Sequence, residues 1–420
     1  MAYEITAVLP QGRLRGTSED GVCRFSAIPY AEPPVGELRF AAPRPAQWRG
    51  DREATRPGPI APQRPSRLRE AMGDFDLPQS EDCLQLTVWT PAVDGRRRPV
   101  VLWLHGGAWQ SGGVLPWYDG AKLAAEGDIV VVAVNYRLAA LGWLPLPGAT
   151  ANAGLLDQEL AIDWVHEHIA AFGGDASALT VMGQSAGASA ICAMLARRPR
   201  FSRAIMQSAA LRGWRGAAPA RCLADAFYTA CGISTLQEAR ALPVESLLQA
   251  QSHPAVLKAL ADEGAGRSLF APVLDGDILP LEMDAVLARA VSRADVLVSY
   301  TRDEMAAFPG EGRGEASAAR SETLFGAPAR TWARSASEAG RRAWLARFDV
   351  GPSERFGACH CVELPFTFGN LDRFDGAPML QGLPRAQAEA LSRRVRAAWI
   401  AFIRGQAPGW PAAPFEQPFA

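Results

Sequence analysis

A serine between two glycines is the strongest chemical signal in the sequence. Gly183-Gln184-Ser185-Ala186-Gly187 follows the β-rich run Leu179–Met182 and precedes an apolar helical run that ends near Leu195. A G-x-S-x-G segment between a strand and a helix is typical of a tight turn that exposes a nucleophilic serine, because its glycines let strand and helix approach closely. The amino end of the helix also favours a developing negative charge. The segment predicts Ser185 as a nucleophile, with an ordinary glycine-rich turn as the alternative.

A second glycine-rich loop follows another apolar strand. His105-Gly106-Gly107-Ala108-Trp109 comes directly after Val100–Leu104. Small residues at this place let backbone N–H groups face a substrate oxygen, as in the H-G-G type of oxyanion loop. Two loops of this kind at two strand ends make coincidence much less plausible than either loop alone.

A serine nucleophile needs a general base, and the chain offers five histidines. His360 is the best candidate, because it follows Ser185 in the chain with acidic residues in between, which is the order Ser, acid, His. The other four have simpler explanations: a place in the oxyanion loop (His105), a solvated helix face (His166 and His168) or an isolated position beside a proline (His253).

The acid that orients the base is expected at the carboxyl end of a strand. The run Ala294–Ser299 leads into Asp303 and Glu304, which are adjacent, so chemistry alone does not choose between them. Asp275 and Asp277 are weaker candidates, since Asp-Gly-Asp is typical of a turn.

Strands and helical segments alternate along most of the chain. The pattern predicts an α/β protein with a mostly parallel central sheet and helices on both faces. The first 60 residues, rich in Pro and Gly, are expected to form a short antiparallel element and a surface wrap. Residues 309–342 are expected to be a loose surface segment with some helix. The main runs are strands at Leu86–Thr90, Val100–Leu104, Ile129–Asn135, Leu179–Met182, Ala204–Gln207 and Ala294–Ser299, and helices at Glu159–Phe172, Ser185–Leu195 and Arg385–Arg404.

Charge and composition narrow the class of protein. The formal net charge of −1 argues against a nucleic-acid partner, which would need a basic face. No apolar run reaches membrane-spanning length, and no secretory signal is visible at the start. Seven scattered cysteines indicate free thiols in a reducing cytoplasm, and Cys359-His360-Cys361 lacks the second ligand pair of a zinc site. We expect no metal and no cofactor.

Beyond these loops, the chain resembles the type-B carboxylesterases, a family that includes cholinesterases and bacterial esterases. The resemblance covers nearly the whole chain and implies the α/β-hydrolase fold in a single domain of residues 1–420. It rests on many ordered blocks: Ile28-Pro29-Tyr30-Ala31-Glu32-Pro33-Pro34, Ser80-Glu81-Asp82-Cys83-Leu84, Asn135-Tyr136-Arg137-Leu138, Asn152-Ala153-Gly154-Leu155-Leu156-Asp157-Gln158 and Phe172-Gly173-Gly174-Asp175, together with the two glycine-rich loops.

The resemblance also implies roles for individual residues. The family's acid is the Glu of a Thr-x-Asp-Glu block, which favours Glu304 over Asp303, and the family's base precedes a Glu-x-Pro-Phe segment, as His360 does here. The oxyanion donors align with the N–H groups of Gly107, Ala108 and Ala186. Two further polar residues, Ser208 and Glu363, align with positions close to the acid and the base.

Two departures from the family pattern matter, one for a disulfide and one for the walls of the site. Ala61 stands where many members have a cysteine that pairs with the Cys83 position. The span between Glu304 and His360 is shorter than in the family, so cap-like helical insertions, expected around 215–265 and 305–355, should leave an open pocket. We expect Trp109 and Trp117 to set its acyl selectivity.

The predicted function is hydrolysis of small-molecule carboxylic esters through an acyl-enzyme formed on Ser185, without a membrane or nucleic-acid partner. One alternative is an amidase or carbamate hydrolase, because the serine turn is common to those enzymes. Another is a non-catalytic interaction module, since some relatives are adhesion proteins. Such proteins are usually exported and have lost the serine, which this chain keeps.

Overall fold

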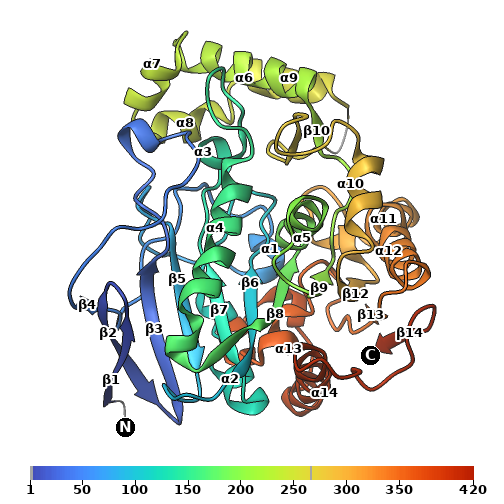
Figure 1. Ribbon diagram of the computed structural model, residues 1–420. Coiled ribbons are helices and arrows are strands. Elements are labelled where there is room, and N and C mark those ends of the chain that lie inside the picture. The colour runs from blue at the N-terminus through green and yellow to red at the C-terminus, as the bar shows by residue number, and fades with distance from the viewer. Residues whose placement is uncertain (1–2, 265–266) are drawn as a thin grey trace.

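One large sheet runs through the molecule. The structure, a computed structural model, describes residues 3–264 and 267–420. Within them the sheet has the strand order β1-β2-β3-β5-β7-β6-β8-β9-β12-β13-β14, with β4 paired to β2 (Figure 1). The strands are β1 (Tyr3–Leu9), β2 (Gly12–Glu19), β3 (Val22–Pro29), β4 (Arg52–Glu53), β5 (Gln85–Thr90), β6 (Arg98–Leu104), β7 (Val130–Val134), β8 (Gly174–Gln184), β9 (Arg203–Gln207), β12 (Asp295–Thr301), β13 (Ala343–Phe348) and β14 (Glu416–Phe419), and a separate pair joins β10 (Arg215–Gly216) to β11 (Val273–Leu274).

The sheet has an antiparallel edge and a longer parallel part. Strands β1, β2, β3, β5 and β7 pair antiparallel in that order, whereas every pair from β7 through β6 to β14 is parallel. Parallel strands need both faces covered, and β7 accordingly has five buried apolar residues in a row. The predicted mostly parallel α/β sheet is confirmed.

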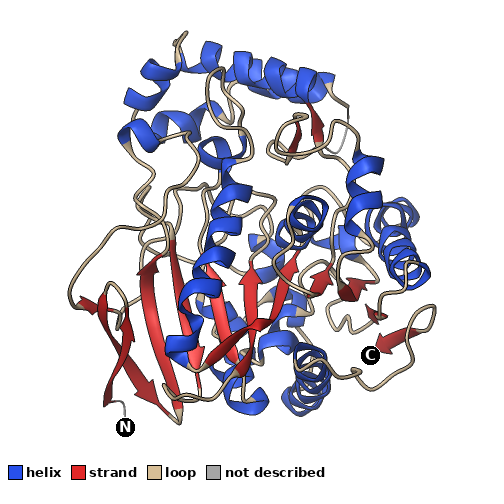
Figure 2. Cartoon of the chain, in the orientation of Figure 1, coloured by secondary structure: helices blue, strands red, loops and turns tan. Residues whose placement is uncertain are grey.

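Helices cover both faces of the sheet (Figure 2). Along β6, Leu102 packs in one apolar cluster with Val165 of α4, whereas the next residue, Trp103, packs in the other with Trp399 of α14. This alternation follows from the two-residue period of a strand. The helices are α1 (Arg69–Met72), α2 (Ala121–Gly127), α3 (Ala139–Trp143), α4 (Ala153–His168), α5 (Ala186–Arg197), α6 (Ala217–Cys231), α7 (Leu236–Ala241), α8 (Val244–Ala250), α9 (Pro254–Asp262), α10 (Met283–Ala290), α11 (Glu315–Ser321), α12 (Ala327–Glu338), α13 (Leu364–Phe368) and α14 (Arg385–Ile403).

Several elements differ from the sequence prediction, which did not include β13 and β14. Helix α4 begins at Ala153 rather than Glu159, and its first turns are fixed by a buried pair in which Arg137 contacts Asp157 at 2.6 Å. Residues 309–342 contain α11, α12 and a π-helical turn (Glu322–Gly326). Trp332 is buried there, so packing against β12 and β13 orders a segment whose composition predicted a looser structure.

The sequence also predicted free thiols and no membrane-spanning segment. All seven cysteines are free; Cys222 is exposed, Cys231 is partly buried and the remainder are buried. Among the helices of residues 3–264 and 267–420, none is long and apolar enough to cross a bilayer.

Candidate active site

Ser185 lies on a sharp turn between β8 and α5. Its backbone has φ 54° and ψ −120°, a conformation that costs free energy for a residue with a side chain. The two glycines of the motif make the turn possible. A Cβ on Gly187 would lie 2.1 Å from the carbonyl oxygen of Leu104, and one on Gly183 would lie 2.7 Å from the backbone of Gly187. The strand, the helix and the neighbouring β6 therefore meet at distances that only glycine permits.

The loop after β6 lies against this turn. A Cβ on Gly106 would lie 3.0 Å from Cβ of Ser185, and Gly107 has φ 113°, a region that favours glycine. Among the described residues, the N–H groups of Gly107 and Ala108 donate to no protein acceptor. Ala186 is the first residue of α5, and the first N–H groups of a helix have no acceptor within it. These donors are free to receive a substrate oxygen.

His105 supports this loop from behind. Its ring stacks on Tyr136 with the centroids 4.3 Å apart, and the Tyr136 hydroxyl donates to the His105 carbonyl at 2.6 Å. Burial lowers the pKa of His105 to about 4, so this histidine is neutral at physiological pH. The neutral, enclosed ring suits a role in shaping the loop rather than in proton transfer.

Glu304 and His360 form a buried pair, although they lie 56 positions apart in the sequence. Glu304 Oε2 contacts His360 Nδ1, while Glu304 Oε1 accepts a hydrogen bond from the Thr301 N–H at 2.9 Å. The backbone N–H of His360 donates to the Glu304 carbonyl at 3.2 Å. Both side chains are almost fully buried, and the rings of Phe308 and Phe325 lie 5.2 Å from the imidazole. This pairing fixes both the position of the ring and the nitrogen that carries the proton.

Asp303 has different partners. Its carboxylate pairs with Arg302 at 3.0 Å and accepts the N–H of Ala358 at 2.9 Å. Burial works to raise the pKa of Asp303, but the Arg302 guanidinium and the Ala358 N–H outweigh it and hold that pKa below its usual range. Asp303 thus braces the loop before His360 and does not contact the imidazole.

The second ring nitrogen of His360 contacts the side chain of Gln184. The distance from His360 Nε2 to Gln184 Nε2 is 3.2 Å, and the same amide donates to Cys361 Sγ at 3.2 Å. No hydrogen bond joins His360 to Ser185 among the described residues. Catalytic hydrogen bonds often form only when substrate is bound. The contact of Gln184 with His360 was not predicted, because Gln184 occupies the variable position of the G-x-S-x-G motif.

Ser185 and His360 open into the same cavity of about 600 Å³. Its wall combines the loop after β6, the segment 64–70, α9 and Phe308. Trp109 and Trp117 are not part of this wall. Trp117 packs on Phe374 and donates its N–H to the Arg373 carbonyl, so the expectation that these tryptophans set acyl selectivity is wrong. A smaller cavity of about 340 Å³ between α10 and α12 contains no predicted catalytic residue.

A turn exposing a serine, beside free backbone donors and a histidine–carboxylate pair, defines the class of α/β-hydrolases. The model of the carboxylesterase family matches residues 4–321. The chain is 36% identical to para-nitrobenzyl esterase of Bacillus subtilis (strain 168), over 96% of this chain and 91% of that protein. It is 39% identical to a probable N-octanoylanthranilate hydrolase of Rhodococcus erythropolis, over 97% and 95% of the two chains.

Solved structures agree with these relatives. A thermophilic para-nitrobenzyl (PNB) esterase superposes with a TM-score of 0.87 at 33% identity, covering 98% of this chain and 94% of that one. A carboxylesterase of Geobacillus stearothermophilus gives a TM-score of 0.82 at 31% identity, with 98% and 93% covered. The chain belongs to the carboxylesterase family and is a carboxylic-ester hydrolase, as the sequence blocks predicted.

Proposed function

We propose that the chain hydrolyses small-molecule carboxylic esters by acyl transfer to Ser185, with His360 as general base and Glu304 as the residue that orients His360. One observation carries this assignment. His360, which Glu304 contacts, lines the same cavity as Ser185 on its strained turn. A general base oriented by a carboxylate and placed beside a nucleophile is the arrangement that acyl transfer requires.

The reaction would proceed in two steps. His360 Nε2 accepts the proton of the Ser185 hydroxyl as Oγ attacks the ester carbonyl, which forms a tetrahedral intermediate. His360 then gives this proton to the departing alcohol, and the acyl group remains on Ser185. Water repeats the sequence, so that the acid leaves and Ser185 regains its proton. Glu304 accepts a hydrogen bond from Nδ1 throughout and stabilises the imidazolium.

The free donors of Gly107, Ala108 and Ala186 would bind the oxyanion. Their position next to Ser185 is fixed before substrate arrives, because the glycine contacts of both loops leave little room for adjustment. Donors that need no reorganisation during the reaction contribute most to the stabilisation of a tetrahedral intermediate.

The wider setting of the site is also part of the proposal. Helices α6–α9 and the segment α11–α12 would act as caps on one domain of residues 1–420, since α9 and Phe308 line the cavity. Seven free cysteines support a location in the reducing cytoplasm.

The name of the Rhodococcus erythropolis relative describes an N-octanoyl compound, which keeps an amidase as the second candidate. A non-catalytic module is not favoured.

Replacing the nucleophile tests the assignment. With para-nitrophenyl butyrate, Ser185→Ala should lower kcat by about 10⁴-fold or more, while a rate about 10³-fold above that in water could remain from the oxyanion donors. Ser66→Ala removes another hydroxyl from the wall of the same cavity and should keep nearly the parent rate. Near-parent turnover in Ser185→Ala, or an organophosphate label on a different serine, would refute the assignment.

A further inference from the structure

The mouth of the catalytic cavity carries an excess of positive charge. Its wall contains four arginines, Arg64, Arg67, Arg69 and Arg267, and one acidic residue, Glu70. The whole chain, in contrast, has 43 basic and 44 acidic residues. The cavity wall is therefore more positive than the chain as a whole.

Most of this charge is not neutralised by the protein. Within the described chain, no carboxylate lies within salt-bridge distance of any of the four arginines. Arg64 contacts a hydroxyl, that of Ser252, and Glu70 contacts Arg355, which leaves it little capacity to neutralise the arginines. Most arginines of this protein do have acidic partners, among them Arg355 and Arg215 close to the same cavity. Exposed guanidinium groups without partners at a cavity mouth are available to a ligand.

The arginines belong to two separate segments of the cavity wall. Three lie on the segment 64–70 that leads into α1, and Arg267 comes from the chain after α9, with its Nη1 3.8 Å from the Cβ position of Gly213. The same wall also contains four leucines, among them Leu257, which is 50% exposed. The cavity thus combines an apolar surface with a cationic rim, and both lead to Ser185.

We propose that this cavity selects esters that carry a carboxylate remote from the bond to be cleaved, bound by the rim arginines while the apolar part of the substrate packs on the leucines. Guanidinium groups suit this role, because their planar donors match the geometry of a carboxylate and can form two parallel hydrogen bonds with it. A cleft lined by one sign of charge also concentrates ligands of the opposite sign. The inference rests on the proposed ester hydrolysis at Ser185 and concerns only which esters reach it.

Two matched esters test the inference: para-butanoyloxybenzoate, which is anionic, and para-butanoyloxybenzamide, which is neutral. They share the acyl group and the shape of the leaving group. Their intrinsic reactivities differ, but this difference is the same for every variant. A change in the ratio of their kcat/KM values between variants therefore reports recognition of the charge.

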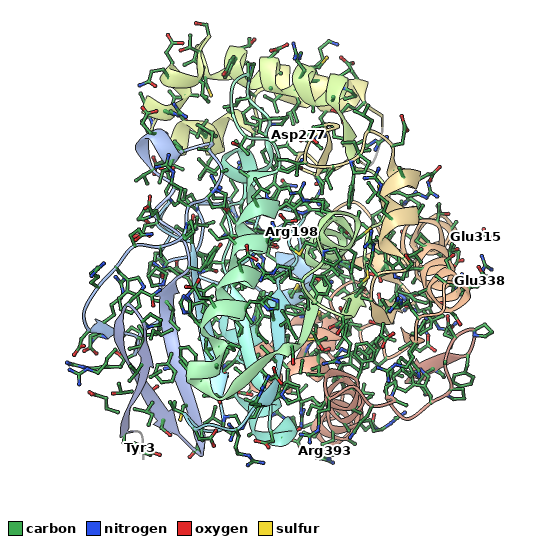
Figure 3. The ribbon with its side chains drawn as sticks, in the orientation of Figure 1. Tyr3, Arg198, Asp277, Glu315, Glu338 and Arg393 are labelled. Carbon is green, nitrogen blue, oxygen red and sulfur yellow. The ribbon has the colours of Figure 1, made fainter. Side chains whose placement is uncertain are left out.

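The double variant Arg67→Gln/Arg267→Gln should lower kcat/KM for the benzoate by about five- to tenfold, as expected for two solvent-exposed ion pairs, and leave the benzamide within about twofold. For the parent enzyme, raising ionic strength from about 0.05 M to about 0.5 M should lower the benzoate value selectively. Arg393→Gln removes one positive charge from an exposed position of α14, away from this cavity, and should change neither ester (Figure 3).

Each result has a distinct meaning. If both esters are cleaved and their ratio is the same in the parent and the double variant, or shifts equally in Arg393→Gln, the carboxylate preference is wrong and the hydrolase assignment stands. If the parent cleaves neither ester nor para-nitrophenyl butyrate, the proposed function fails and this inference fails with it. Preserved benzamide cleavage shows that the double variant is folded.

Discussion

Two adjacent acids with unlike surroundings give the sharpest test at the scale of single residues. Glu304→Gln should lower kcat by about 10⁴-fold, because the amide can hold His360 in the wrong tautomer. Asp303→Asn should be far milder, since Asp303 contacts Arg302 and the Ala358 N–H rather than the imidazole. Steady-state rates of the two variants decide the matter, and the opposite ranking would move the orienting role to Asp303.

Glu363 provides a second prediction, which concerns how the stability of the fold depends on pH. Burial, and then the nearby charge of Glu304, raises the pKa of Glu363 from its ordinary value of 4.5 to about 8. Below the ordinary value both folded and unfolded chains hold the proton. Between about pH 4.5 and pH 8 the unfolded chain releases it while the folded chain keeps it. The free energy of unfolding should therefore fall as pH rises, by up to about 1.4 kcal/mol per unit from this group.

Denaturant unfolding of the parent and Glu363→Gln at several pH values would measure this effect. The glutamine stays neutral, so the stability of the variant relative to the parent should increase from pH 5 to pH 8. A difference between the two proteins that does not vary with pH would show that Glu363 is ionised in the folded state over this range.

The motif residues were predictable from sequence, and the family resemblance indicated Glu304 as the partner of His360, but the contact with Gln184 was not predicted. Ser185 and the two glycine-rich loops follow from local spacing, and the order Ser, acid, His pointed to His360. The contact between His360 and Gln184 joins residues 176 positions apart and depends on side-chain rotamers. The failed expectation for Trp117 has the same origin, because nearness in sequence to the oxyanion loop did not reveal that its ring packs on Phe374.

At the scale of elements, the close approach of α5 to β6 controls the site. Gly187→Ala would place a methyl group 2.1 Å from the Leu104 carbonyl, which belongs to backbone and cannot swing away. We expect a loss of stability of about 1–3 kcal/mol. A displaced nucleophile should also lower kcat/KM by about 100-fold. Thermal unfolding and ester assays measure both effects.

Gly95→Ala is the matched control, because a Cβ at Gly95 meets nothing within 4 Å. It should leave stability and rate nearly unchanged. Equal behaviour of the two glycine variants would mean that α5 and β6 have more freedom than their contact indicates.

Most strands with strong apolar runs were found from sequence, although the buried strand β13 was not, and the short edge strand β14 was missed. The core strands β6 and β7 matched their predicted runs to within about two residues because both faces of the sheet bury them. Strand β14 was missed, since Glu416–Phe419 is short, contains a proline and lies at the sheet edge. The helical segment α11–α12 was underestimated because Trp332 and its neighbours gain their order from packing, which composition does not express.

For the whole molecule, the cavity should accept large alcohol groups. Its volume of about 600 Å³ and a mouth formed by exposed residues such as Leu257 and Pro309 give bulky leaving groups room. Butyrate esters of ethanol and of a naphthol should differ in kcat/KM by no more than their chemical reactivities predict. A collapse for the naphthyl ester would show that the caps close over the substrate, while leaving the roles of Ser185 and His360 intact.

The distribution of thiols should allow selective labelling of the folded enzyme at one cysteine. Of the seven cysteines only Cys222 is exposed, and it lies on α6 in the helical layer at the top of Figure 1. A maleimide dye added to the native protein should therefore attach there first, without any engineered cysteine. The label would sit on the helices beside the cavity and could report their movement, while the five buried thiols would accept dye only as the core opens.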